Sequence, residues 1–293
     1  MHAFTIKDLE NLSGIKAHTI RIWEQRYSFL NPSRSDTNIR YYSNEELKML
    51  LNIALLNKYG FKISHIDRMT IGDMEEKIFS LTQVEAQQER TVNDMIHCMV
   101  AMDVEGMELL LDNYIGLHSI EKAIVQIIFP FLERIGILWL TNHINPAQEH
   151  LVTNIIRQKL LVGIDRLPHH TQAKHTVILF LPEGEHHELG LLFVYYLLKT
   201  NAVKVIYLGA DVPIKDLATV VKLKAPDCIF SHLTTVAINF NFEKFLNNFH
   251  LLLPDVKMVV SGQVIQGYKK VIPQNIHFMR SLAEVKEYII TIN

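Results

Sequence analysis

Residues 174–293 alternate between short apolar runs and longer stretches of helical periodicity, and this alternation constrains the fold more than any other feature. The runs expected to form strands are His175–Leu181, Val203–Leu208, Cys228–His232, Val256–Ser261 and Ile276–Met279. Helices are expected between them, beginning at Glu185 and Pro213, with a last helix over Ser281–Ile290. Strands that alternate with helices predict a parallel sheet covered on both faces. We therefore expect a doubly wound, five-stranded, flavodoxin-like α/β domain, which binds ligands at the carboxyl ends of its strands.

The middle of the chain, residues 76–170, shows helical periodicity throughout. Apolar residues recur three and four positions apart, as at Ile124, Ile127 and Phe131, which predicts amphipathic helices packed as a bundle. The segment Asn145–Gln148 places an asparagine before a proline and a glutamine, a pattern typical of a helix start. We expect a helical bundle between the N-terminal region and the sheet.

The first part of the chain has the pattern of a helix-turn-helix followed by a hairpin. The expected elements are a helix over Ile6–Leu12 capped by Thr5, a turn at Ser13-Gly14, and a second helix over Ala17–Tyr27. Turn residues between two short β-prone pieces then predict a hairpin between Asn31 and Tyr42, which would act as a wing. Such a region is a candidate for binding nucleic acid.

Charge supports this interpretation only locally. The whole chain has a formal net charge of -2, so it lacks the bulk basic character of many nucleic-acid-binding proteins. The segment Met1–Thr70 carries ten Lys/Arg against seven Asp/Glu, an excess of three positive charges. Donors suited to base edges and phosphates are His18, Thr19, Arg21 and Arg26 on the second helix, and Arg34 and Arg40 on the hairpin.

The spacing of these residues resembles the MerR family of transcription regulators. The match includes Thr19-Ile20-Arg21-x-Trp23-Glu24-x-Arg26-Tyr27, Pro32-x-Arg34 and Arg40-Tyr41-Tyr42-Ser43. The resemblance implies a winged helix-turn-helix that binds double-stranded palindromic operator DNA as a dimer. The implied DNA contacts are Arg21, Arg26, Arg34, Arg40, Tyr41 and Tyr42. The alternative is a small helical domain with solvated arginines, and because no cysteine lies between Gly60 and Thr91, heavy-metal sensing is not expected.

The loop after the first expected strand contains a histidine at the ligand-binding edge of the sheet. A neutral imidazole such as that of His187, near the positive end of a helix dipole, is a suitable ligand for a transition metal. A nearby carboxylate, Glu185 or Glu188, would accept the other ring proton and orient the ring. A structural or solvated histidine is the alternative, as is a zinc site from His186 and His187, although adjacent residues rarely converge on one metal.

The sequence Glu185-x-His187-x-x-Gly190 resembles the Asp-x-His-x-x-Gly loop of cobalamin-binding domains, with Glu in place of Asp. The resemblance implies that His187 is the lower axial ligand of the cobalt. Two further segments match in order: Ser231-His232-Leu233 corresponds to the family's Ser-x-Leu, and Ser261-Gly262 stands where Gly-Gly is usual. The resemblance places Ser231, Leu233, Ser261 and Gly262 around the nucleotide tail of the cofactor.

Trp139, followed after nine residues by Glu149-His150, resembles the Trp-x9-Glu-His motif of light-sensing, cobalamin-dependent MerR-type repressors of carotenoid genes. The resemblance implies adenosylcobalamin, with methylcobalamin as the alternative, bound between bundle and sheet with Trp139 over its upper face. It also implies a ligand-bound dimer or tetramer that binds DNA and dissociates in light. In the light-sensing proteins a histidine follows the motif tryptophan directly. Leu140 occupies that position here and His143 is the nearest substitute, a departure that concerns the light response.

These expectations combine into a DNA-binding repressor that is controlled by cobalamin and is not an enzyme, and the response to light stays open because of Leu140. The expected domains are residues 1–75, 76–170 and 171–293. Two distant cysteines, the absence of an apolar run of about 18 residues, and the lack of a signal peptide predict a cytoplasmic protein that does not bind membranes. Two alternatives remain open: a MerR-type regulator with a cofactor-free sheet domain used for protein interaction, and a corrinoid methyl-transfer carrier, against which the DNA-binding region argues.

Overall fold

The computed structural model describes residues 4–140, 144–168, 173–235 and 240–292, with only the backbone described over 137–140. It separates into two compact units, Met1–Ile156 and Arg157–Asn293. The expected boundary between residues 75 and 76 falls inside the helix Ile71–Phe79, and the boundary between 170 and 171 lies outside the described residues. The division into three domains therefore stays a prediction.

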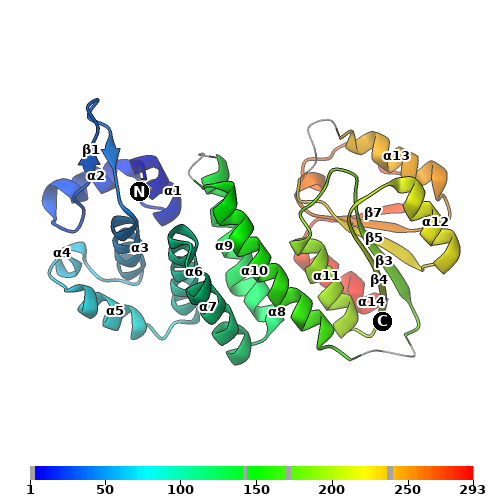
Figure 1. The fold of residues 1–293 in the computed structure, drawn as a ribbon, viewed down its shortest axis with the longest axis horizontal. Helices are drawn as coiled ribbons and strands as arrows, with labels where there is room; N and C mark the ends of the chain where they lie inside the picture. The colour runs from blue at the N-terminus through cyan, green and yellow to red at the C-terminus, as the bar shows by residue number, and fades with distance from the viewer. Residues whose placement is uncertain (1–3, 141–143, 169–172, 236–239, 293) are drawn as a thin grey trace. The chain divides into compact units, whose positions relative to one another are not determined.

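The first unit begins with the expected helix-turn-helix and wing (Figure 1). Its first elements are α1 (Ile6–Ser13), α2 (Ala17–Arg26), β1 (Ser33–Arg34), β2 (Arg40–Tyr41), α3 (Asn44–Lys58) and α4 (Ile63–Ile66). Thr5 and Asp8 form a capping box at the start of α1, and Gly14 ends that helix with a φ of 73°, a left-handed conformation that glycine adopts without strain. The prediction of two helices joined by a tight turn, and of a hairpin after them, is confirmed.

The elements that follow in the described part of this unit are helices, as predicted. They are α5 (Ile71–Phe79), α6 (Val84–Ala101), α7 (Val104–Leu117), α8 (Ile120–Ala123), the π-helix η1 (Ile124–Ile128), α9 (Phe129–Leu140) and the start of α10 (Pro146–Asp165). Asn145 caps α10 as expected, because its Oδ1 accepts a 2.9 Å hydrogen bond from the Ala147 amide, while Gln148 Oε1 accepts one from the Asn145 amide. The wide turn of η1 precedes Pro130, which cannot donate a backbone hydrogen bond.

The second unit contains the predicted parallel sheet, with strand order β4-β3-β5-β6-β7. The strands are β3 (Thr176–Pro182), β4 (Lys204–Val212), β5 (Cys228–His232), β6 (Met258–Ser261) and β7 (Ile276–Met279). Four helices alternate with them: α11 (Leu189–Thr200), α12 (Ile214–Lys224), α13 (Phe242–Leu252) and α14 (Leu282–Thr291). In Figure 1, α11 and α14 cover one face of the sheet and α12 and α13 the other. The predicted doubly wound α/β fold is confirmed.

One helix begins later than expected. A helix from Glu185 was predicted, but α11 starts at Leu189 and the chain from Glu185 to Glu188 is not helical. The reason is a long-range contact: the buried carboxylate of Glu185 accepts hydrogen bonds from the amide of His187 and from the amide of Thr235. These bonds hold the loop in a non-helical path. Across the described residues, no helix combines the length and apolarity needed to cross a bilayer.

Candidate functional site

The second helix of the helix-turn-helix presents the predicted donors to solvent. Arg21, Arg26 and His18 are exposed on α2, and Thr19 is half-buried with its Oγ1 3.4 Å from His18 Nε2. Because these side chains lie along one short helix, they are available to base edges or phosphates. Their roles as DNA contacts remain predictions.

The predicted wing residues are joined to the same helix by a carboxylate that the sequence analysis did not single out. Glu24 Oε2 lies 2.8 Å from Arg40 Nε and 3.2 Å from the Tyr42 hydroxyl, and Glu24 Oε1 lies 3.3 Å from Arg34. The Glu24 hydrogen bond raises the pKa of Arg40 above its ordinary value. Burial, together with the charge of Glu24, raises the pKa of Tyr42. The only signal in the sequence was an acid within a helix otherwise rich in bases.

This arrangement gives the wing residues different surroundings. Tyr42 is buried in the core, and its backbone pairs with that of Phe4 through two 2.8 Å hydrogen bonds. Arg40 and Tyr41 are half-buried, whereas Arg34 is exposed. Arg34 therefore remains accessible to DNA while also bonded to Glu24, and Tyr42 contributes mainly to holding the hairpin against the helices.

The tryptophan motif is placed only in part. Trp139 lies near the end of α9, but its side chain lies outside the described residues, as does His143. Glu149 is half-buried in the first turn of α10, where its carboxylate lies 2.9 Å from His150 Nδ1 and accepts a 2.8 Å hydrogen bond from the Thr153 hydroxyl. Whether these three side chains face one cavity stays a prediction.

The loop after β3 fixes His187 at the carboxyl edge of the sheet. Its Nδ1 lies 2.6 Å from Glu185 Oε1 and 3.1 Å from the Thr235 hydroxyl, while the side chain is 56% exposed. Burial alone would raise the pKa of Glu185, but hydrogen bonds from the His187 ring and from two backbone amides outweigh it and keep that pKa below its ordinary value. An ionised carboxylate therefore orients the ring.

The second acid proposed as an orienting group has another role. Glu188 Oε1 accepts a 2.8 Å hydrogen bond from the Tyr207 hydroxyl, and its other oxygen lies 2.5 Å from Arg157. Of the two alternatives, Glu185 and not Glu188 bonds the imidazole. His186 is exposed, and no group of three or more metal-binding side chains gathers anywhere in the described part of the chain.

The two other matching segments meet where β5 and β6 end. The Leu233 amide donates to the Ser261 carbonyl at 2.8 Å, and Ser231, Leu233 and Ser261 are all buried. Gly262 has a φ of 106°, and a β-carbon there would lie 2.2 Å from the Leu233 carbonyl oxygen, so no other residue fits without displacing the backbone. The Ser231 hydroxyl is buried and has no hydrogen-bond partner among the described residues.

A residue that the sequence analysis did not assign, His232, lies among these positions. Its Nδ1 is 2.8 Å from the Ser261 hydroxyl, and its ring packs against Gly190 at the start of α11. Burial lowers the pKa of His232 to about 4, although the charge of Glu185 acts in the opposite direction. The ring is therefore neutral at pH values near 7. Its only signal in the sequence was its position at a strand end.

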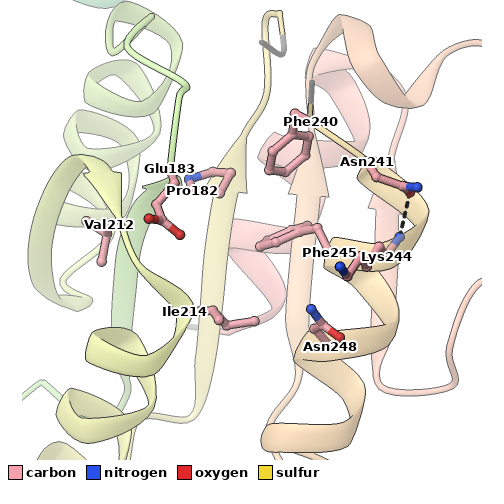
Figure 2. Close-up of a pocket in the computed structure, with 9 residues that line it drawn as sticks. All are labelled: Pro182, Glu183, Val212, Ile214, Phe240, Asn241, Lys244, Phe245 and Asn248. Carbon is pink, nitrogen blue, oxygen red and sulfur yellow. Dashed lines mark hydrogen bonds between the residues drawn. The ribbon is translucent and has the colours of Figure 1, made fainter. Parts of the chain in front are cut away.

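A separate pocket of about 390 Å³ lies between α12 and α13, at the carboxyl ends of β3 and β4 (Figure 2). Pro182, Val212 and Phe245 supply apolar walls, and Glu183, Asn241 and Lys244 supply polar ones. None of the predicted cofactor residues lines it. The space between Gly190 and Ser261 is instead taken up by the ring of His232.

Comparisons with protein families agree with this geometry. Residues 4–71 match the family described as MerR HTH family regulatory protein, which spans α1 to α4. Residues 91–162 match the family described as B12 binding domain. The second match begins within α6 and runs through α7, α8, η1 and α9 into most of α10, and it includes Trp139, Glu149 and His150.

Whole-chain relatives give a consistent result. The HTH-type transcriptional repressor CarH of Myxococcus xanthus is 29% identical over 92% of this chain and 91% of its own length, and the repressor CarA of the same organism is 29% identical over 76% and 74%. The monomethylamine corrinoid protein of Methanosarcina barkeri shares the fold, with a TM-score of 0.55 at 15% identity over 75% of this chain and all of that chain. The chain thus joins a MerR-type helix-turn-helix domain to a B12-binding domain and is a homologue of the CarH and CarA repressors.

Proposed function

We propose that this chain is a DNA-binding transcription repressor whose assembly and operator binding are controlled by a bound cobalamin. The observation that carries this proposal is the union of a MerR-type helix-turn-helix and a B12-binding domain in one chain, aligned over 92% of its length with a transcriptional repressor. The DNA-binding residues we propose are His18, Thr19, Arg21, Arg26, Arg34, Arg40 and Tyr41. Tyr42, which is buried, would hold the wing in place for them.

The residues of the sheet edge suit a corrinoid. His187 is more than half exposed, and its Nδ1 is held by an ionised carboxylate, which is the arrangement of a histidine that ligates a metal through Nε2. The buried Ser231 hydroxyl lacks a partner among the described residues, and such a group is stabilised when a ligand supplies one. When bound, the corrinoid would supply a cobalt centre, and His187 would ligate it.

Each residue of the His187 loop has a separate task in this proposal. Glu185 would accept a hydrogen bond from Nδ1–H and so fix the tautomer in which Nε2 carries the lone pair. The Thr235 amide holds the other Glu185 oxygen at 2.8 Å, which keeps the carboxylate in place. Together they would present a preoriented imidazole to the cobalt of the corrinoid.

A ligand can control DNA binding if it has different affinities for two assembly states of the protein. A ligand that binds one assembly state more tightly than another shifts the population towards that state. We propose adenosylcobalamin as the ligand, a dimer or tetramer as the DNA-binding form, and a palindromic operator. No substrate bond needs to be made or broken, so we propose no enzymatic activity, and methyl transfer to a thiol in a direct assay would contradict this.

The test uses the purified full-length protein in the dark with adenosylcobalamin or methylcobalamin. Size-exclusion chromatography with visible detection reports binding and assembly, and fluorescence anisotropy of a labelled operator reports DNA affinity. The proposal expects corrinoid absorbance to co-elute with a larger species that binds DNA more tightly. Illumination of the same sample then shows whether Leu140, in place of histidine, still permits a response to light.

Two variants assign the cobalt ligand. His187→Ala should weaken cobalamin binding and shift its visible spectrum, while His186→Ala, the adjacent exposed histidine, should leave both unchanged. Equal behaviour of the two variants would exclude the axial role of His187. A protein that binds operator DNA but no corrinoid would show that the sheet domain is a cofactor-free interaction module.

A further inference from the structure

The ring of His232 occupies a confined space at the carboxyl edge of the sheet. His232 ends β5 and pairs in register with Ser261 of β6, and its Nδ1 lies 2.8 Å from the Ser261 hydroxyl. On its other side the ring packs against the first turn of α11, where a β-carbon on Gly190 would lie 2.2 Å from His232 Cδ2. The ring is thus held between a helix backbone and a neighbouring strand.

This space adjoins the loop of the expected axial ligand. Gly190 follows His187 by three residues, and the Glu185 carboxylate, which bonds His187, also acts electrostatically on His232. In cobalamin the nucleotide base hangs from the same face of the corrin ring that a histidine ligand approaches. When the histidine takes the cobalt, the displaced base needs room beside that histidine, and glycines leave the most room along a backbone.

We propose that His232 determines which corrinoids the chain accepts, because its imidazole, fixed by Ser261, closes the space beside Gly190 that a nucleotide tail would enter. This inference rests on the proposed binding of a corrinoid through His187. A corrinoid with a nucleotide must displace the ring and break its bond to Ser261. A corrinoid without the nucleotide keeps both in place.

The backbone around His232 is less able than its side chain to move aside for a nucleotide. Leu233 donates to the Ser261 carbonyl at 2.8 Å and accepts from the Val264 amide at 3.2 Å, so the ends of β5 and β6 are bonded to each other. Gly262 already contacts the Leu233 carbonyl without space for a β-carbon. Room beside Gly190 therefore comes from rotation of the His232 side chain.

The experiment compares cobalamin with cobinamide, which keeps the corrin ring and cobalt but lacks the nucleotide. Dissociation constants for both are measured by visible absorbance on the full-length wild-type chain and on His232→Ala. In the wild type, cobalamin must break one part-buried hydrogen bond and the packing of the ring, so their absence predicts about tenfold tighter cobalamin binding in the variant. Cobinamide affinity should stay within about twofold, because its binding does not displace the ring.

Two further variants provide a second test of the hydrogen bond and a control for the loss of a histidine. Ser261→Gly leaves the imidazole in place but removes its hydrogen bond, so the cobalamin-to-cobinamide ratio should move in the same direction by a smaller amount, even if His232→Ala folds poorly. His250→Ala, which removes another histidine with a 2.7 Å bond to a neighbouring side chain, should leave the ratio unchanged. Circular dichroism confirms that each variant is folded.

Four outcomes would overturn the inference. Weaker cobalamin binding in His232→Ala would mean that the ring binds the nucleotide. Equal changes for both corrinoids would mean that His232 acts on the corrin ring or on the fold. If cobinamide binding depends on His187 and the ratio does not move, the proposed function stands and this inference fails. If neither corrinoid binds any variant, the proposed function fails and the inference with it.

Discussion

The imidazole of His232 fills the position that any side chain at Gly190 would need, since a β-carbon there would lie 2.2 Å from His232 Cδ2 and 2.4 Å from Nε2. Helix α11 can therefore approach β5 as closely as it does only because residue 190 has no side chain. The two residues form one packing unit, although 42 positions separate them in the sequence.

Gly190→Ala should destabilise the second unit, because the ring must move and lose its bond to Ser261. We expect a loss of about 1–3 kcal/mol in the free energy of unfolding, measured by urea denaturation. In a His232→Ala background the same substitution should cost much less, and the double-mutant cycle gives the coupling. Gly116→Ala, at a helical position with nothing within 4 Å of the added carbon, is the control and should be neutral or stabilising. Additive effects of the two substitutions would contradict the packing described.

Lowering the pH should reduce the free energy of unfolding of the second unit at pH values above those at which its carboxylates are protonated. Burial lowers the pKa of His232 from 6.5 to about 4. As the pH falls below 6.5, this histidine is therefore protonated in the unfolded state but stays neutral in the folded state, which lowers the free energy of unfolding. Between pH 7 and about pH 5 the stability should fall by up to about 2 kcal/mol. Glu185, whose pKa lies below 4.5 when folded, contributes only at lower pH. Urea unfolding of the wild type and of His232→Ala at both pH values measures the change in the free energy of unfolding. If His232→Ala loses as much stability as the wild type between these pH values, another group is responsible for the pH dependence.

Glu24→Gln should weaken DNA binding even though it removes a negative charge from the DNA-binding domain. The carboxylate bonds Arg34, Arg40 and Tyr42, and its loss frees the wing from α2 at a cost of about 1–3 kcal/mol. Anisotropy titrations at matched salt measure the affinity. Glu45→Gln, an exposed acid on α3, makes the same charge change and should bind DNA as tightly as wild type or slightly more tightly. A gain of affinity in Glu24→Gln would mean that charge outweighs positioning.

Arg21→Ala should lower operator affinity without changing the unfolding free energy by more than about 0.5 kcal/mol, since the side chain is exposed. If it contacts a phosphate, the slope of log affinity against log salt should fall by about one. If it reads a base, the loss should be larger on the operator than on random DNA. Lys222→Ala, an exposed cation on α12, is the control. Wild-type affinity in Arg21→Ala would remove this residue from the interface.

Local patterns predicted most of the elements because the determining interactions are local. The strands Cys228–His232 and Ile276–Met279 were expected with the bounds observed, and the Asn145 cap was predicted from a segment of four consecutive residues. The start of α11 was wrong by four residues because the determining bond runs from Glu185 to Thr235, across 50 positions. A contact between residues so far apart in the sequence cannot be predicted from hydrophobic periodicity, which reflects local structure only.

The same limit applies to the candidate sites. The motifs located His187, Ser231 and Ser261, but a motif describes His232 only as an unspecified residue between two others. Likewise, Arg40 and Tyr42 were interpreted from their chemistry as DNA contacts, and their common partner Glu24 became evident only once the hairpin was seen against α2. The type of a residue tells which interactions its side chain can make, whereas the fold determines with which neighbour it makes them.

The bonded ends of β5 and β6 have a kinetic consequence. With Gly262 pressed against the Leu233 carbonyl, adjustment at this edge is left to side-chain rotation. Rotamer changes of exposed side chains take picoseconds to nanoseconds and loop motions take nanoseconds to microseconds, so the movement of a side chain is the faster of the two kinds of adjustment. Corrinoid association should then be limited by encounter, with an observed rate that rises in proportion to ligand concentration and does not level off.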